Sequence, residues 1–169
     1  MTERSLAPEA LTADAFAPFG HVIETPSRPH DAEGPGWRWW AETTELGGDE
    51  RTWTIGYLDL APAPPARFDW AERHMRSPEA IVPVSGSCLV YVAPPEHPDE
   101  PDELPPLDAF RVFRLEPGTG VVMDPAVWHG APIVTDGPAK AIVLLLAGTG
   151  RTDVTKVPFA DTPVLIQEA

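Results

Sequence analysis

The chain contains few cysteines and few basic residues. Its single cysteine, Cys88, excludes an internal disulfide and any site in which several cysteines hold zinc or an iron–sulfur cluster. Twelve lysines and arginines stand against 26 aspartates and glutamates, which gives a formal net charge of −14. Nucleic acids and anionic membranes require a basic surface, so we expect neither of them as a partner.

Long apolar runs are also missing. No run approaches the ~20 residues that cross a bilayer as a helix, and the first eight residues lack the basic-then-apolar order of a secretory signal. We therefore expect a cytoplasmic protein. A chain of 169 residues can bury roughly 70% of its unfolded surface in one domain. We expect residues 1–169 to form that single domain without a structural metal.

Prolines and glycines, by contrast, are abundant and are spread along the chain, with 22 and 13 copies. This spacing leaves little room for long helices. The short runs between these residues are typical of the strands of antiparallel sandwiches and barrels. We expect strands over residues 19–24, 53–60, 68–74, 80–93, 109–115, 120–124 and 141–147. We expect one short helix over residues 13–17, with Thr12 as its N-cap and Pro18 behind it.

Residues 94–108 form the most polar segment of the chain, with six prolines and six acidic residues. Such a composition cannot pair into a sheet or bury much surface. We interpret the segment as a solvated loop and not as a second domain. We expect that removal of residues 96–104 leaves the fold intact.

The segment Glu72-Arg73-His74, followed by Glu79, carries the most chemistry. Alternate residues of a strand point to the same side, so Glu72 and His74 share a face. Arg73 points to the opposite side, where we expect it to pair with surface acids. A short turn then places Glu79 at the start of the next strand.

The spacing Glu-x-His, four residues, Glu, six residues, Gly ends at Gly86, and a second histidine, His129, follows a Gly- and Pro-rich segment. These features resemble the two motifs of the cupin superfamily, with Glu72 in place of the leading histidine. The resemblance implies an all-β fold, a cupin-type antiparallel barrel (double-stranded β-helix or jelly roll) with one short N-terminal helix. In cupins the matching side chains converge inside the barrel and usually hold one divalent metal.

More narrowly, the chain resembles the ureidoglycolate lyase family over nearly its whole length. The resemblance rests on residues 16–24, on Glu72-Arg73-His74 with Pro83 and Gly86, on the loop that ends at residues 107–110, and on the segment from Gly120 to Trp128-His129. It implies a lyase that splits ureidoglycolate into glyoxylate and urea in allantoin degradation, a part of purine metabolism.

That reaction needs a base for the substrate hydroxyl and an acid for the departing nitrogen. His74 and His129 suit both roles, since an ordinary histidine pKa of ~6.5 lies near neutral pH. Arg38 could bind the carboxylate of a small anionic metabolite with two parallel hydrogen bonds. Trp128 is a candidate substrate contact, although an aromatic side chain is more often part of a core. Residues 37–40 contain three tryptophans, which indicates a rim or subunit contact and favours a homodimer.

A metal-assisted form of this chemistry is a second possibility. Glu72, His74, Glu79 and His129 together form a donor set that suits Ni, Mn, Fe or Zn. A bound divalent ion would hold the substrate and lower the pKa of its hydroxyl. It would also relieve the repulsion between two nearby carboxylates. No organic cofactor is expected.

Three functions follow from these observations. The first is a ureidoglycolate lyase, which the resemblance over the whole chain favours. The second is another metal-dependent cupin enzyme, an isomerase or dioxygenase acting on a small hydroxy or keto acid. Departures from the family pattern favour it, because Glu33 stands in place of an amide and residues 145–147 lack the usual Asp-Arg. The third is a non-catalytic cupin that binds a small ligand, which the retained His74 and His129 disfavour.

Overall fold

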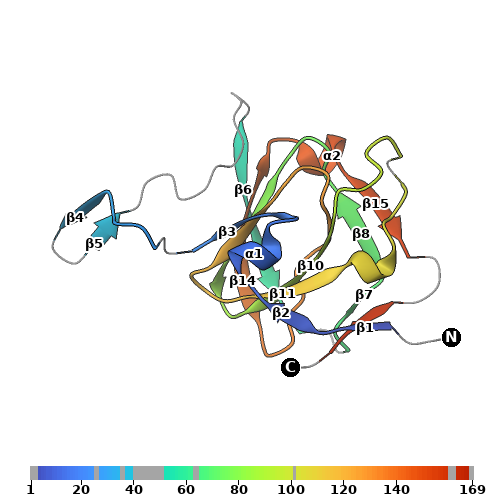
Figure 1. The fold of residues 1–169 in the computed structure, drawn as a ribbon, viewed down its shortest axis with the longest axis horizontal. Coiled ribbons are helices and arrows are strands. Elements are labelled where there is room, and N and C mark those ends of the chain that lie inside the picture. Colours follow the sequence, from blue (N-terminus) through green and yellow to red (C-terminus); the bar gives the residue numbers. More distant parts are fainter. Residues whose placement is uncertain are drawn as a thin grey trace.

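In the computed structural model, two β-sheets face one another and form a barrel (Figure 1). The structure describes residues 4–24, 27–34, 37–39, 52–62, 65–100, 102–159 and 163–167. The six-stranded sheet has the order β15-β8-β13-β10-β11-β2. Its strands are Thr155–Pro158 (β15), Trp70–Arg73 (β8), Trp128–His129 (β13), Cys88–Ala93 (β10), Arg111–Leu115 (β11) and Pro8–Ala10 (β2).

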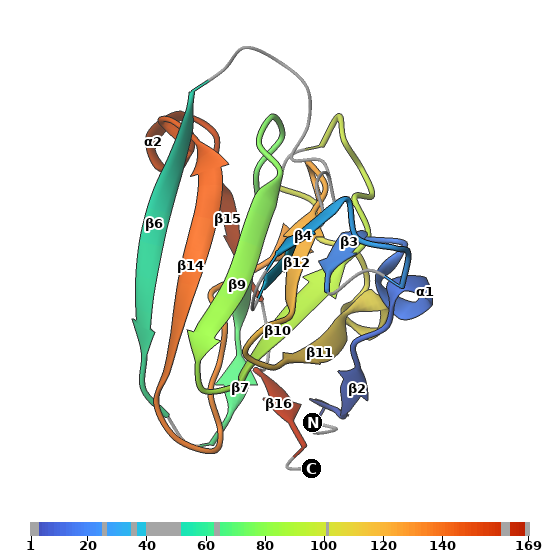
Figure 2. The same cartoon turned by 90° about the vertical axis from the view of Figure 1, so that its left-hand side faces the viewer.

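The five-stranded sheet has the order β3-β12-β9-β14-β6 and faces the viewer in Figure 2. Its strands are Gly20–Ile23 (β3), Gly120–Met123 (β12), Glu79–Ser85 (β9), Ala139–Leu146 (β14) and Trp53–Leu60 (β6). A third sheet combines β1 (Arg4–Leu6), β16 (Val164–Ile166) and β7 (Arg67–Phe68). The remaining two strands, β4 (Ala32–Gly34) and β5 (Trp37–Trp39), form a hairpin that stands away from the barrel (Figure 1).

The helices are few and short. The α-helices are α1 (Ala13–Phe16) and α2 (Thr149–Thr152), and a 3₁₀ turn, η1, covers Leu107–Ala109. Within the described ranges no helix is both long and apolar enough to cross a membrane. Helix α1 confirms the expected N-terminal helix, and the Thr12 hydroxyl accepts a hydrogen bond from the backbone N–H of Ala15 at 3.1 Å. Helix α2 was not predicted.

The predicted all-β barrel is confirmed, and most neighbouring strands are antiparallel. The exceptions are β2, which runs parallel to β11, and β1, which runs parallel to β16. The single run expected over residues 80–93 is two strands, because the chain turns at Gly86 with a φ of +68°. A Cβ at this position would lie 2.5 Å from the carbonyl oxygen of Pro138, so only glycine fits the turn. The single domain expected over residues 1–169 stays a prediction.

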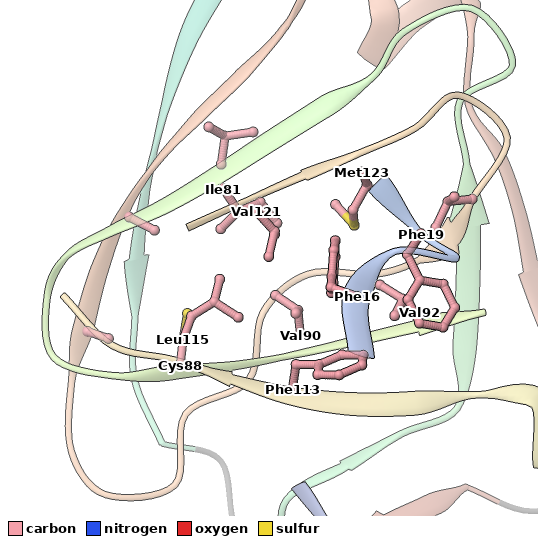
Figure 3. Packing of buried hydrophobic residues seen from close by; sticks show 14 of the residues in the cluster. Phe16, Phe19, Ile81, Cys88, Val90, Val92, Phe113, Leu115, Val121 and Met123 are labelled. Atoms are coloured by element: carbon pink, nitrogen blue, oxygen red, sulfur yellow. The ribbon is translucent and has the colours of Figure 1, made fainter. Parts of the chain in front are cut away.

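The main hydrophobic core fills the space between the two sheets (Figure 3). Phe16, Phe19 and Phe113 pack edge to face, with ring centroids 5.2 to 5.8 Å apart, an arrangement that stabilises aromatic clusters. Ile81 and Val121 approach these rings from the five-stranded sheet. Helix α1 therefore closes one side of the barrel with its apolar residues.

A second core cluster covers the other face of the six-stranded sheet. Every residue of β10 is buried, because its alternate side chains enter the two clusters in turn. Phe68 stacks on Tyr91 in this second cluster, with ring centroids 3.9 Å apart. Leu104 and Leu107 pack against it from the acidic loop. The six-stranded sheet is thus covered on both faces.

Candidate functional site

The candidate site lies between the two sheets. Glu72 on β8 and His129 on β13 are direct neighbours in the register of the six-stranded sheet. His74 follows β8, and Glu79 is the first residue of β9 in the opposite sheet. The four residues that the sequence singled out therefore gather from three strands and both walls of the barrel.

Glu79 connects the two histidines. Its Oε2 atom lies 3.1 Å from Nε2 of His74 and 3.2 Å from Nε2 of His129. The two imidazole rings meet at an angle of 66° with centroids 5.0 Å apart. Both histidines are buried, so these contacts are shielded from water and are stronger than on a surface.

The other nitrogen of each ring is held by the backbone. His74 Nδ1 lies 2.8 Å from the carbonyl oxygen of Asp153, and His129 Nδ1 lies 2.9 Å from that of Val127. Because a carbonyl oxygen can only accept, both Nδ1 atoms carry a proton. In the neutral form of each ring, the Nε2 lone pair then points to Glu79.

Two lone pairs directed at one carboxylate oxygen repel it, so the arrangement calls for a proton or a cation between these atoms. Burial by itself would raise the pKa of Glu79, but the charges and hydrogen bonds of His129 and His74 outweigh it and lower that pKa to about 2. Burial would likewise lower the pKa of His129, yet the charge and hydrogen bond of Glu79 raise it. Without a metal, these two shifts favour an ion pair between the Glu79 carboxylate and a protonated His129 imidazole.

Three of the four residues could hold a metal ion. Glu72, His74 and His129 each offer a ligand atom, and these atoms lie within 4.8 Å of one another. Two imidazole nitrogens and a carboxylate are suitable donors for borderline divalent ions. The backbone carbonyls on both Nδ1 atoms orient the rings as in many histidine metal sites. Glu79, whose Oε2 atom contacts Nε2 of each histidine, does not belong to this group of three.

Asp153 supports the site from behind, although no sequence pattern pointed to this residue. Its carboxylate accepts hydrogen bonds from the backbone N–H groups of Met75, Arg76 and Ser77 at 3.0 to 3.1 Å. This turn joins His74 to Glu79. Asp153 therefore holds both the ring of His74, through its carbonyl, and the connection to Glu79, through its carboxylate.

Arg73 does not pair with surface acids as expected. It is buried, and its guanidinium donates hydrogen bonds to the carbonyl oxygens of Glu96, His97 and Glu100 at 2.8 to 2.9 Å. It also lies 4.5 Å from the ring centroid of Trp128. The alternation of β8 was correctly predicted, but the acceptors are backbone atoms of the acidic loop, which a sequence does not reveal.

The two predicted substrate contacts lie apart from this cluster. Trp128 is fully buried in the second core cluster, a position that favours packing over substrate binding. Arg38 is exposed on the β4–β5 hairpin, opposite Glu33, and within one chain the hairpin stands away from the barrel (Figure 1). A substrate-binding role for either residue stays a prediction.

Lys156 is a further candidate contact, which no sequence motif indicated. Lys156 on β15 pairs in register with Glu72, which itself pairs with His129. Residues in register share a face of a sheet, so this cation belongs to the same face as the two site residues. Its Nζ atom lies 3.5 Å from the ring centroid of Trp70. Only the strand order of the sheet shows that Lys156 lies near Glu72 and His129.

A cavity of about 350 Å³ lies next to the cluster. Its lining includes Arg76, Thr149 and Asp153. It does not include the two histidines, and Asp153 is its link to His74. The candidate site is therefore the group of side chains that converge on Glu79, and the cavity lies beside it.

Comparisons with known proteins agree with the geometry. A family model described as "Ureidoglycolate lyase" matches residues 3–167. A ureidoglycolate lyase of Rhodobacter capsulatus is 31% identical over 163 residues, covering 94% of this chain and 96% of the relative. Ureidoglycolate lyase 2 of Rhizobium meliloti is 30% identical over 148 residues, covering 83% and 85%.

Among solved structures, a dTDP sugar isomerase from Desulfovibrio desulfuricans has a TM-score of 0.52 at 15% identity. The match covers 83% of this chain and 86% of the isomerase, and it supports the barrel fold alone. The family model matches residues 3–167, and the relatives have this identity and coverage. Together these matches show the family. The chain belongs to the ureidoglycolate lyase family.

Proposed function

We propose that this protein is a ureidoglycolate lyase, which eliminates urea from (S)-ureidoglycolate and releases glyoxylate. The observation that carries the proposal is the family match over residues 3–167. The cluster of His74, His129 and Glu79 supports it, because the reaction needs acid and base groups at one carbon atom.

The reaction is a proton transfer coupled to the cleavage of one bond. A base removes the proton of the substrate hydroxyl, the carbon–oxygen double bond forms, and the bond between this carbon and the ureido nitrogen breaks. The departing nitrogen takes up a proton and leaves as urea. No oxidant or further reactant is consumed, so a pair of proton-transfer groups is sufficient.

We assign the acid role to His129 and the base role to His74. Glu79 raises the pKa of His129, which favours its protonated form and places a transferable proton on Nε2. His74 presents the lone pair of Nε2 when it is neutral, because its Nδ1 proton is donated to the Asp153 carbonyl. Glu79 keeps the two rings close to one another through a single oxygen atom.

Glu72, His74 and His129 would hold a divalent metal in the metal-assisted form of the reaction, with Ni, Mn, Fe and Zn as candidates. Such an ion would supply Lewis acidity that lowers the pKa of the substrate hydroxyl. Glu79 would then be the buried carboxylate nearest to the two ligating rings and could accept the proton.

Lys156 is our candidate for binding the substrate carboxylate. It is the cross-strand neighbour of Glu72, and a lysine ammonium can pair with a carboxylate that reaches the same face of the sheet. Replacement by methionine should raise KM while the fold is kept. An unchanged KM in Lys156→Met would remove this residue from the site.

The test of the function is an assay that measures both products. Purified protein is incubated with (S)-ureidoglycolate after chelation, and again after Mn²⁺, Ni²⁺, Fe²⁺ or Zn²⁺ is restored. We expect urea and glyoxylate in equal amounts, well above the spontaneous rate. The absence of enzymatic release under every metal condition would refute the lyase.

A second candidate is a metal-dependent enzyme acting on another small hydroxy or keto acid. Glu72, His74 and His129 could bind a metal ion. This favours the alternative, because a metal held by such residues can support many kinds of reaction. A metal-dependent conversion of another acid, with no urea released from ureidoglycolate, would select this alternative.

A further inference from the structure

The residues that directly precede the two site histidines meet on the other side of the six-stranded sheet. Glu72 on β8 lies opposite His129 on β13, so the antiparallel register places Arg73 opposite Trp128. Alternate side chains of a strand point to opposite faces, and this pair therefore points away from the site. Both side chains are fully buried, and the guanidinium carbon of Arg73 lies 4.5 Å from the indole centroid. A stacked pair thus lies directly behind the segments that carry the histidines.

Backbone pairing gives these two strands little support. Strand β13 has two residues, and one register pair, Glu72 with His129, joins it to β8. The backbone N–H of Ala126 donates a hydrogen bond to the carbonyl oxygen of His74 at 2.7 Å and adds a further link. Where the ladder between two strands is this short, cross-strand side-chain pairs contribute much of its stability. The position of His129 relative to His74 therefore depends on the stacked pair.

The acidic loop holds the guanidinium of Arg73 from the other side. The carbonyl oxygens of Glu96, His97 and Glu100 accept hydrogen bonds from its two terminal nitrogens at 2.8 to 2.9 Å. Because a guanidinium is planar and rigid, these bonds also fix the plane that lies on the indole ring. Tryptophan is the aromatic residue that attracts such a cation most strongly, above all away from water. Arg73 is thus held by the loop and by the ring together.

We propose that Arg73, stacked on Trp128, is a positioning residue that keeps the two site histidines at their distance from one another. Glu79 can contact both rings through one oxygen atom only when this distance is kept. The inference rests on the proposed function, in which the two rings transfer protons. A displacement of about 1 Å can lower a rate by ~10²-fold. Arg73 faces away from the site, so its effect on the reaction passes through the backbone of β8.

The first measurement is the turnover of (S)-ureidoglycolate by variants that circular dichroism shows to be folded. Arg73→Met should lower kcat by about 10-fold or more with a smaller change in KM, because the geometry of the proton-transfer groups sets the rate of the chemical step. Arg73→Lys should recover part of this loss, since an ammonium group can also lie on the indole ring. Trp128→Phe should lower kcat less than Arg73→Met, because it keeps an aromatic ring.

Arg111 provides the matched control. It also lies on an aromatic ring, 4.9 Å from the centroid of Phe113, and it donates a hydrogen bond to the carbonyl oxygen of Ala15. Its strand, β11, consists of Arg111–Leu115, none of which belongs to the site. Arg111→Met should therefore lower the melting temperature and keep the wild-type kcat. A general loss of stability would affect both arginine variants alike.

The second measurement needs no substrate, so it tests the positioning role even if the wild type shows no lyase activity. Heteronuclear NMR spectra of labelled histidine side chains are recorded at one pH for the chelated protein. The imidazole signals of His74 and His129 should shift in Arg73→Met and stay in place in Arg111→Met. If Arg73→Met does not fold, Trp128→Phe replaces it. This change should spare the fold, because the indole N–H that it removes has no hydrogen-bond partner in the described part of the chain.

Three results would overturn the inference. The first is a folded Arg73→Met, or its replacement Trp128→Phe, in which the signals of both site histidines are unshifted. The second is an equal shift of these signals in Arg111→Met. The third is a wild-type kcat in folded Arg73→Met when the wild type is an active lyase. A wild type without lyase activity would instead refute the proposed function.

Discussion

Glu79 sets the charge of the site, because one of its oxygens contacts both imidazole Nε2 atoms. A glutamine at this position would accept hydrogen bonds but would carry no charge to stabilise a protonated ring. The sequence identified Glu79 as a potential metal ligand. The structure adds that, in the protein without a metal, Glu79 lies against buried His129 as its counter-ion and also contacts His74.

The pH dependence of stability should reflect this ion pair. The pKa of Glu79 is lowered to about 2 from an ordinary 4.5. A lowered pKa stabilises the folded state above pH 4.5, and this contribution is lost as the pH falls towards 2. In the chelated protein, the unfolding free energy of Glu79→Gln should therefore fall less than that of the wild type between pH 4.5 and pH 2. Urea denaturation at several pH values measures it, with Glu24→Gln as control, because Glu24 is exposed and lies outside the cluster. Identical pH profiles for the wild type and Glu79→Gln would contradict the assignment.

The two histidines should be essential for turnover. We expect His74→Ala and His129→Ala each to lower kcat by ~10²-fold or more, the usual contribution of a general acid or base. The control is His21→Ala, because His21 is an exposed histidine on β3 outside the cluster. Product release from ureidoglycolate is the measurement. Wild-type rates in both site variants would show that the chemistry occurs elsewhere.

At the scale of elements, the turn between β8 and β9 determines the distance between His74 and Glu79. Asp153 accepts three backbone hydrogen bonds from this turn. Ser77 adds a further link, since its hydroxyl accepts a hydrogen bond from the backbone N–H of Leu146 on β14 at 3.0 Å. The turn is thus fastened to the segment after α2 and to the opposite sheet.

Asp153→Ala should destabilise the protein and lower its activity. Hydrogen bonds to a charged group contribute about 1.5–3 kcal/mol each. We expect a loss of about 2 kcal/mol or more in unfolding free energy, measured by urea denaturation. Asp153→Asn keeps one side-chain oxygen and should fall between the wild type and Asp153→Ala. Equal stability of all three proteins would show that the turn does not depend on this carboxylate.

The acidic loop is less independent of the fold than its composition indicates. Residues 95–100 are all exposed, as predicted, yet three of their carbonyl oxygens accept the hydrogen bonds of buried Arg73. Removal of residues 96–104 would leave this guanidinium without these acceptors, which is costly for a buried charge. We therefore replace the expectation of an intact fold with one of lowered stability.

A variant that combines the loop deletion with a substitution of Arg73 tests whether loss of these acceptors lowers stability. The deletion of residues 96–104 should lower the melting temperature, and the same deletion combined with Arg73→Met should recover part of the loss. The recovery is expected because the unpaired charge is removed while an apolar side chain still covers Trp128. An unchanged melting temperature in the simple deletion would restore the original expectation.

For the whole molecule, the site joins the two sheets, so ligand binding and folding are coupled. Glu72 and His129 belong to one sheet and Glu79 to the other. Any ion that binds only the folded arrangement raises stability by mass action.

Metal binding should therefore be visible in thermal melting. Addition of a suitable divalent ion to the chelated protein, at about 100 times its Kd, should raise the melting temperature by about 5–10 °C. Glu72→Gln and His74→Ala should lose most of this shift, whereas His21→Ala should keep it. A similar shift in all three variants would place the bound ion outside the cluster.

The sequence by itself determined the chemistry-bearing residues and much of the local structure. Strand alternation placed Glu72 and His74 on one face, and Gly86 indicated the turn between β9 and β10. These features depend on residues that are close together along the chain, so the sequence pattern alone predicts them. The cytoplasmic location expected from the sequence stays a prediction.

The tertiary structure decided which of these residues meet and what supports them. The pairing of β8 with β13 brings His129 beside Glu72, and the pairing of β15 with β8 adds Lys156. The partners of Arg73 and of Nδ1 of His74 are backbone carbonyls more than twenty positions away, and every residue carries such a carbonyl. Strand order and register arise from the packing of the whole chain, and they determine which carbonyl groups accept these hydrogen bonds. The same packing covers one sheet on both faces and leaves the other with an apolar surface.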